Sequence, residues 1–436
     1  MTPNPQIVKS IEKLDYRVTV GEVAANAGLE INTAQQGLLA LAADAGGHLQ
    51  VAETGDVVYL FPKNFMSILR NKYWQLRWKE SWGKVWKVLF YLIRVSFGIV
   101  LIASIVLMLA AIAVIVIAVS ASGGDGDDDR GGYGGGGGMI FLPRFWIGPD
   151  FFWWFYPDYN SRRRQRRRQT NGNQMNFLES VYSFLFGDGN PNADLEEIRY
   201  ATIGQAIQNN DGAVIAEQIA PYVDRVDADE DYMIPVLARF NGYPEVSPEG
   251  EIIYYFPELQ VMASQRQKRS VPNYLQEQLW RFTQASSTQK ILAIGLGGVN
   301  IILALVLGSF LQDPAIVAQL GGLVAFVNSI YPVLIGYGIA FLVIPLIRYF
   351  WIQGRNQKIV TRNQARESRA MILKQASDTL RQKLLFARQF TERKVISDRN
   401  LAYTTEDDLL DQNLRDRDKI DAQWQQRLES GSSEEI

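Results

Sequence analysis

The chain has no cysteine among its 436 residues and only one histidine, His48. Without cysteine there is no disulfide, no thiolate nucleophile, no thiolate-ligated iron–sulfur cluster and no Cys-type zinc site. A glycine-rich phosphate loop with its lysine and a GxSxG motif are also missing. His48 falls in a predicted hairpin, where we expect a surface position rather than a catalytic base. We therefore predict a protein that is not an enzyme, with no catalytic residue, no metal site and no cofactor.

Charged residues are missing from three long stretches, 95–119, 291–311 and 323–347. Each stretch reaches the length of about 20 residues that crosses the hydrocarbon of a bilayer. The alternative is a buried core helix, but such a helix rarely stays apolar on all sides for so long. Three transmembrane helices without ionisable residues give little support to an ion or proton pathway. The glycines expected at close helix contacts are Gly295, Gly298, Gly336 and Gly338.

One segment of the chain occurs twice. Residues 46–62, GGHLQVAETGDVVYLFP, recur as residues 241–257, NGYPEVSPEGEIIYYFP. Each copy follows a pattern of short helices and ends in a β-rich hairpin. The pattern predicts two winged-helix-like modules, at 1–65 and 176–262, in an α+β membrane protein.

A winged helix suggests nucleic-acid binding, but the charge of both modules argues against it. Residues 18–62 have five acidic residues and no Lys or Arg, and residues 200–257 have ten acidic residues against two arginines. Nucleic-acid binding needs cations that displace condensed counterions. We therefore favour protein partners, with Asp229, Glu230 and Asp231 as candidate contact residues. A membrane-tethered nucleic-acid binder and a transporter or channel subunit are the alternatives.

Basic residues predict the orientation of the spans. They crowd a Trp-rich juxtamembrane helix at 66–94, a second juxtamembrane helix at 263–290, and the residues after 347, whereas residues 312–322 have one aspartate and no basic residue. The positive-inside rule then places both modules on the cytoplasmic side. One crossing by the first span would leave the second module outside. We therefore expect the aromatic segment 139–159 to be an interfacial or re-entrant return.

The flanks of this aromatic segment differ in composition. Residues 120–138 are rich in Gly and Asp, which predicts a flexible loop. Residues 160–175 form an Arg-rich linker, whose expected role is contact with anionic membrane lipids, with RNA binding as the competing interpretation. The arginines of this lipid anchor are Arg162, Arg163, Arg164, Arg166, Arg167 and Arg168.

The C-terminal region has two parts. Residues 348–398 carry an apolar stripe at helical spacing on a charged surface, which predicts a long amphipathic helix that packs on a module or a partner. Residues 399–436 are predicted to form an acidic tail.

Several segments together carry a family resemblance. VVYLFP precedes a basic tryptophan-rich stretch, a Gly/Asp loop follows the first span, and the tail contains IPLIRYFWIQGRNQKIVTRNQARESRA and LRQKLLFARQF. In these segments the chain resembles an uncharacterised multi-pass membrane family of cyanobacteria and plant plastids, over nearly its whole length. Plant relatives carry a label linking them to iron–sulfur cluster biosynthesis, which for a cysteine-free chain implies at most an indirect role.

The resemblance implies a thylakoid or plasma membrane. Residues 1–17 include Glu12 and Asp15 and lack the character of a transit peptide, so we expect a bacterial member. The sequence as a whole predicts a membrane scaffold or assembly factor whose paired acidic modules bind protein partners on the cytoplasmic side.

Overall fold

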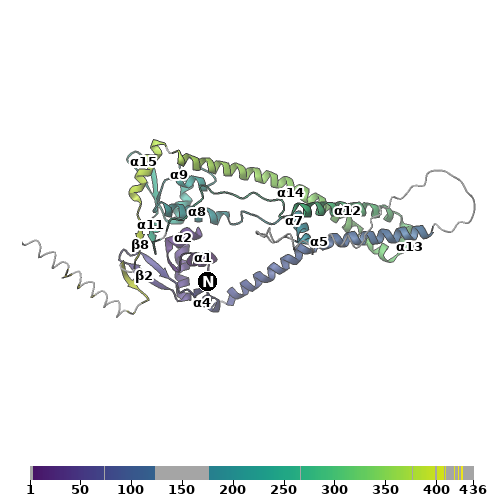
Figure 1. Cartoon of the computed structure of the whole chain (residues 1–436), viewed down its shortest axis with the longest axis horizontal. Helices are drawn as coiled ribbons and strands as arrows, with labels where there is room; N and C mark the ends of the chain where they lie inside the picture. The colour runs from purple at the N-terminus through teal and green to yellow at the C-terminus, as the bar shows by residue number, and fades with distance from the viewer. Residues whose placement is uncertain are drawn as a thin grey trace, which may run out of the picture. The chain divides into compact units, whose positions relative to one another are not determined.

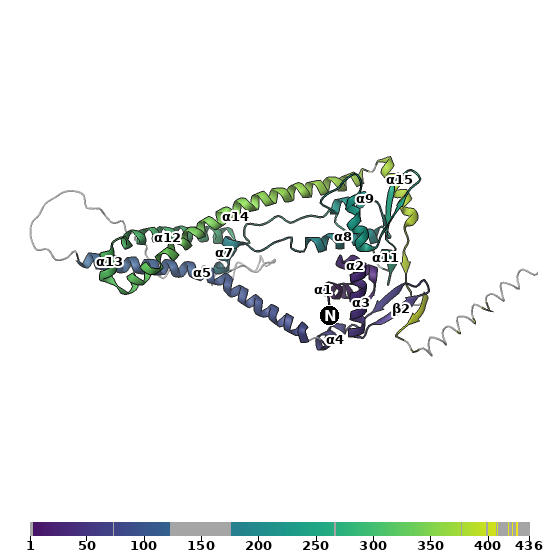
Figure 2. The same ribbon diagram turned by 180° about the vertical axis from the view of Figure 1, so that it is seen from behind.

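The computed structural model describes residues 3–122 and 176–406, except positions 73, 266, 376, 398 and 399, together with a few positions beyond 406. The chain divides into two compact units, whose elements are labelled in Figure 1 and seen from behind in Figure 2. The modular unit contains residues 1–83, 191–279 and 357–436, and the helical unit contains residues 84–190 and 280–356.

Module 1 opens the modular unit with three helices and three antiparallel strands. Thr19 begins α2 through a capping box with Glu22, and Gly28 and Gly46 end α2 and α3 in the left-handed region. The strand order β1-β3-β2 places the last strand between the other two. The elements are α1 (Pro5–Lys13), β1 (Arg17–Thr19), α2 (Val20–Ala27), α3 (Ile31–Ala45), β2 (His48–Ala52) and β3 (Val57–Leu60).

Module 2 repeats this plan. Its helices and strands follow in the same order, its sheet has the equivalent order β4-β6-β5, and Asn241 takes the left-handed position of Gly46. A short 3-10 helix, η4 (Asp231–Met233), leads into its last helix. The other elements are α8 (Leu195–Asn209), β4 (Ala213–Val214), α9 (Ala216–Ile219), α10 (Ile234–Phe240), β5 (Tyr243–Val246) and β6 (Ile252–Tyr255).

The two modules share one hydrophobic core, because α2 of module 1 packs on α8 of module 2. A Cβ atom at Gly204 would lie 2.7 Å from the Cα of Ala25, so glycine is what lets these backbones approach. Arg239 extends from module 2 and donates a 2.5 Å hydrogen bond to the carbonyl of Gly28. The modules therefore form one body rather than two independent domains.

A C-terminal strap, residues 378–405, crosses both modules. Its helix α15 (Asp378–Ala387) packs on β6, and its short strand β8 (Lys394–Val395) pairs in parallel with β7 (Val261–Met262), which follows α11 (Pro257–Gln260). Its last strand, β9 (Leu401–Thr404), adds antiparallel to β2 and is the yellow strand beside β2 in Figure 2. The expected C-terminal helix over 348–398 is thus divided, because the helix from the third span ends at Lys374 and α15 begins only at Asp378.

The juxtamembrane helix expected over 263–290 is not helical in the described residues before Ser287. Asparagine side chains satisfy the backbone of this segment instead. Asn363 accepts from the N–H of Glu277 at 3.0 Å and donates to its carbonyl at 2.9 Å. Within the helical unit, Asn356 pairs with the N–H and carbonyl of Trp280 in the same way, at 2.8 and 2.9 Å. A chain whose backbone groups are paired like this has no need of helical hydrogen bonds.

Among the described residues, three helices are long and apolar enough to cross a membrane: α5 (Trp74–Ser122), α12 (Ser287–Leu311) and α14 (Gly322–Lys374). The helical unit contains all of α12, α5 from residue 84 onward and α14 up to residue 356. The shorter helices are α7 (Phe177–Phe186) and α13 (Pro314–Leu320), while α4 (Phe65–Lys72) precedes α5 in the modular unit. The region 176–262 expected as one module therefore loses its first helix, α7, to the helical unit.

Small residues and one polar pair join the long helices. The Asn300 amide, fully buried, donates to the Ser104 hydroxyl at 2.6 Å. A Cβ at Gly338 would lie 3.0 Å from Asn300 Oδ1, and one at Gly297 would overlap the ring of Phe341. The other three expected contact glycines, Gly295, Gly298 and Gly336, have no side chain or backbone within 4 Å of an added Cβ. Of the four glycines named from the sequence, Gly338 thus lies at a close helix contact in the described residues, as do Gly297 and Gly308.

Candidate functional site

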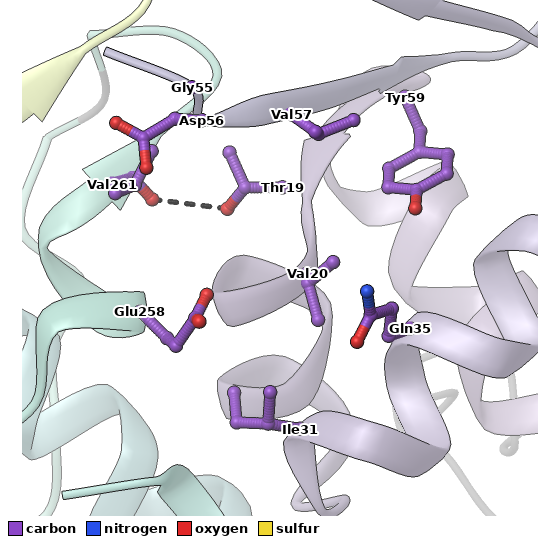
Figure 3. Close-up of a pocket in the computed structure, with 10 residues that line it drawn as sticks. All are labelled: Thr19, Val20, Ile31, Gln35, Gly55, Asp56, Val57, Tyr59, Glu258 and Val261. Carbon is purple, nitrogen blue, oxygen red and sulfur yellow. Dashed lines mark hydrogen bonds between the residues drawn. The ribbon is translucent and has the colours of Figure 1, made fainter. Parts of the chain in front are cut away.

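A recess of about 190 Å³ opens in module 1, beside the first turns of α2 and α3 (Figure 3). The tip of the hairpin between β2 and β3 forms a second wall, and α11 with β7 forms a third. In Figure 3 the carboxylates of Asp56 and Glu258 lie on one side, with Gln35 and Tyr59 on the other. The ten lining residues are Thr19, Val20, Ile31, Gln35, Gly55, Asp56, Val57, Tyr59, Glu258 and Val261.

Local sequence explains why these groups meet. Gly55, with φ of 87°, closes the hairpin and brings Asp56 to the rim. Gly21 leaves no room for a Cβ because the backbone of Glu258 lies directly against it. Thr19 fixes the neighbouring strand by donating a 3.0 Å hydrogen bond to the carbonyl of Val261. The carboxylate of Glu258 therefore lies in a recess of module 1, although Glu258 directly follows the second copy of the repeat in sequence.

The recess is acidic. Burial, and the nearby charge of Asp56, raise the pKa of Glu258. Burial also raises the pKa of Tyr59. No Lys or Arg is among the ten lining residues, so no cation in the wall offsets the two carboxylates. Such a site favours a positively charged ligand.

Module 2 has a second acidic site, and this one contains a lysine. Lys383 of α15 has a side chain only 4% exposed, and its Nζ lies 2.8 Å from Glu230, 3.1 Å from Glu217 and 3.7 Å from Glu251. Tyr254 donates a 2.7 Å hydrogen bond to Glu230. Burial disfavours the charged lysine, but the hydrogen bonds and charges of Glu230 and Glu217 outweigh it and raise the pKa of Lys383. These contacts attach the strap to module 2.

A third polar cluster joins the C-terminal half of α14 to module 2. Arg366, with a side chain 1% exposed, pairs with Asp224 and lies 2.9 Å from Glu277. Arg362 makes a bidentate pair with Glu277 at 2.7 and 2.6 Å. Burial opposes ionisation of both carboxylates, yet the arginine contacts outweigh it and lower the pKa values of Asp224 and Glu277. The basic residues after the third span therefore bind protein groups in this region.

In the described residues, the strap pairs with the outer strand of the module 1 sheet, β2, but not with the corresponding strand of module 2, β5. In module 1 the N–H of Leu49 donates to the Thr405 hydroxyl at 2.8 Å, and the N–H of Thr405 donates to the Leu49 carbonyl at 2.9 Å. Leu49 faces Tyr59 across the hairpin, and Pro244 faces Tyr254 in the same register. Proline lacks the N–H that such an outer strand needs, so the β5 edge cannot accept a strand in this way.

The predicted contact residues of module 2 are separated by the structure. Asp229 and Asp231 are exposed, whereas Glu230 is partly buried and engaged by Lys383 and Tyr254. Arg162, Arg163, Arg164, Arg166, Arg167 and Arg168 lie outside the described residues, as does the aromatic segment 139–159. The acidic tail beyond 406 is described only at scattered positions.

Sequence reasoning did not find Lys383, Arg366 or Glu258. Lys383 stands 153 positions from Glu230, and Arg366 stands 142 positions from Asp224. An ordinary lysine or arginine on a charged helix gives no local sign of such distant partners. The sequence feature that points to these contacts is the excess of acidic residues in both modules, because clustered carboxylates are stabilised by a cationic partner.

In its described residues the structure is a mixed helix and sheet protein with two repeated modules and three helices long and apolar enough to span a membrane. The chain is 38% identical over 425 residues to an uncharacterised chloroplastic protein of Arabidopsis thaliana, across 93% of this chain and 79% of the plant protein. The chain belongs to the family of that chloroplastic protein. No protein-family model and no solved structure matches it.

Proposed function

We propose that the chain is a non-enzymatic membrane scaffold or assembly factor, whose two modules are winged-helix-like and bind protein partners. The order helix, strand, helix, helix, strand, strand, with the third strand between the first two, supports the winged-helix assignment in both modules. In this arrangement α3 and α10 take the place of recognition helices.

The surface of α3 favours protein over nucleic acid. Its outward residues include Asn32, Gln36 and Leu39, and Leu39 is 45% exposed. No Lys or Arg occurs between residues 18 and 62, and the adjoining recess presents two carboxylates. A phosphate backbone would meet repulsion here, whereas a basic or apolar protein surface would be complementary.

The connections of the helical unit support a membrane topology with both modules on one side. Arg94 near the start of the first span pairs with Asp188 after α7 at 3.4 Å, and a Cβ at Gly98 would touch Leu178 of α7. The start of the first span and the end of α7 therefore lie at the same end of the helical unit. The basic flanks favour the cytoplasm for this side, at a thylakoid or plasma membrane.

A transporter or channel is the rival class. In the described part of the helical unit, Asn300 and Ser104 bond to each other at 2.6 Å between α12 and α5, and the Tyr337 hydroxyl of α14 donates to the Phe97 carbonyl of α5. Such pairs orient helices and provide neither charge nor a proton relay. This favours a structural role for the helical unit.

The observation that carries the proposal is the acidic, cation-free surface formed by α3 and its recess in a module attached to long apolar helices. The protein should be crosslinked in its native membrane, purified in mild detergent and analysed by mass spectrometry. A reproducible set of other proteins supports the scaffold function. Recovery of copies of the chain alone, together with solute flux in reconstituted vesicles, would overturn it, as would salt-sensitive retention on DNA or RNA.

A further inference from the structure

The internal repeat allows the acidic sites of the two modules to be compared position by position. The hairpins align without a gap, since His48 pairs with Leu60 where Tyr243 pairs with Tyr255. In this alignment Asp56 at the rim of the recess corresponds to Glu251. Tyr59 on the wall of the recess corresponds to Tyr254, which donates to a carboxylate in module 2.

A third pair matches by sequence position, although Gln35 lies within α3 and Glu230 precedes η4 with a left-handed backbone. Gly46 after α3 and Asn241 after α10 are both left-handed and stand at matching positions of the repeat. Gln35 precedes Gly46 by the same number of residues as Glu230 precedes Asn241, so the two residues align in the repeat. Gln35 lines the recess, and Glu230 is the nearest carboxylate to the lysine of the strap.

By hairpin register, Asp56 and Tyr59 of the recess therefore stand where Glu251 and Tyr254 stand in the lysine site of module 2, and Gln35 aligns with Glu230 by sequence position. In module 2 the ligand is Lys383, contacted by Glu230 and Glu251 of the module. In module 1 the same place is a cavity of about 190 Å³. That volume corresponds to about six waters at about 30 Å³ each, which is room for the four methylenes and the ammonium of a lysine side chain.

The two sites obtain their remaining carboxylate differently. Module 2 uses Glu217, near the start of α9. Near the start of α2, module 1 has Gly21, and the backbone of Glu258 packs against it, so the side chain of Glu258 supplies the negative charge. Since Gln35 replaces a glutamate, the recess has two carboxylates where module 2 has three.

The elements that cover the sheets of the two modules also differ. Ile253 of module 2 packs with Leu380 and Ala387 of α15, whereas the equivalent Val58 packs with Val261 of β7 and Ile396, which follows β8. A helix could not lie across module 1 as α15 lies across module 2. The recess accordingly fits one side chain that enters from outside.

We propose that the module 1 recess binds a lysine side chain of a partner protein, between Asp56 and Glu258, as module 2 binds Lys383 of its own chain. This rests on the proposed function and specifies the chemistry of the partner. The partner presents the lysine on an exposed segment, and Gln35 and Tyr59 complete the polar wall around the ammonium.

The test uses the full-length protein in its native membrane and a water-soluble carbodiimide, which joins a carboxylate to a contacting amine. The contact of Lys383 with Glu230 and Glu217 serves as the internal positive control. The variant is Asp56→Asn with Glu258→Gln, which keeps the shape of the recess and removes its charge. The matched control is Glu53→Gln, an exposed acid in the same hairpin.

The expected product is an amide between Asp56 or Glu258 and a lysine of another protein. The double variant should lose this product and lower recovery of that protein about tenfold or more, while Glu53→Gln leaves both unchanged. Full recovery of the partner by the double variant, without a product at the recess, overturns the inference and leaves the scaffold function standing. A product only with a lysine of the same chain also overturns it. If neither wild type nor variant recovers another protein, the proposed function itself fails.

Discussion

Replacing Lys383 with methionine should loosen the strap from module 2. Methionine retains the apolar contacts of the lysine stem but removes the ammonium that three carboxylates share. Breaking a buried ion pair by removing one partner costs about 3–5 kcal/mol. Glu217 and Glu251 are 36% and 48% exposed and can rehydrate, so we expect the lower limit, about 3 kcal/mol.

Hydrogen exchange of the α15 amides in the full-length protein measures this directly. A loss of about 3 kcal/mol accelerates exchange through local opening by about a hundredfold or more. Amides of β3 provide the internal reference, because the strap does not pair with that strand. The matched control is Arg381→Met in the same helix, where an exposed pair with Asp378 contributes less than about 0.5 kcal/mol.

The pH dependence adds a second check. The folded-state pKa of Lys383 is raised above 10.5, so its contribution is fully present below that value and disappears as pH rises through the folded pKa. The difference between wild type and Lys383→Met should therefore be constant near neutral pH. Exchange of α15 within about threefold of wild type, or no faster than in Arg381→Met, would refute the reasoning.

Three further outcomes are expected. Glu258→Gln should stabilise the modular unit at neutral pH by up to about 1 kcal/mol, because the raised pKa makes ionisation of Glu258 costly. This gain should vanish below the ordinary pKa of 4.5; a denaturation series across pH tests this, and destabilisation by Glu258→Gln at neutral pH would contradict it. Leu49→Pro should release β9 by removing the outer N–H of β2, whereas Pro244→Leu should leave strap protection unchanged; equal protection in both variants by limited proteolysis would contradict the assignment. Gly297→Leu should cost about 1–3 kcal/mol in detergent stability by overpacking the helix contact, whereas Gly295→Leu should be tolerated, and equal melting temperatures would count against the packing described.

The parts of the fold that depend on local sequence were predictable. The long apolar helices follow from uncharged stretches, and the paired modules follow from the repeat at 46–62 and 241–257. Hairpin register is encoded within each repeat by residues such as Gly55 and Gly250 at the turns. These features need no information from distant residues.

Contacts between distant segments were not predictable. Residues 263–286 resembled a helix in composition, but Asn363 on α14 satisfies the backbone at Glu277. The edge that β9 occupies depends on the difference between Leu49 and Pro244, which a hairpin pattern does not reveal. Whether a glycine lies against another helix depends on how the helices pack. Spacing in the sequence therefore could not show that Gly297 contacts Phe341 and that Gly295, in the described residues, contacts no neighbouring helix.

In the candidate site, too, local composition was predictable and contacts between distant residues were not. The acidity of both modules was visible in composition, but the identity of the cation was not, because Lys383 comes from a helix 153 positions after Glu230. Glu258 was equally hidden, since it lies beyond the second repeat and reaches the first one only in the folded unit.

Photocrosslinking from the exposed face of α3 tests the central claim most directly. A photoreactive residue at Leu39, activated in the native membrane, should give a discrete adduct with another protein, and the same residue at the exposed Leu385 of α15 reports non-specific capture. The scaffold account predicts a protein adduct from Leu39 that Leu385 does not give. A nucleic-acid adduct from Leu39, or protein adducts identical at the two positions, would contradict it.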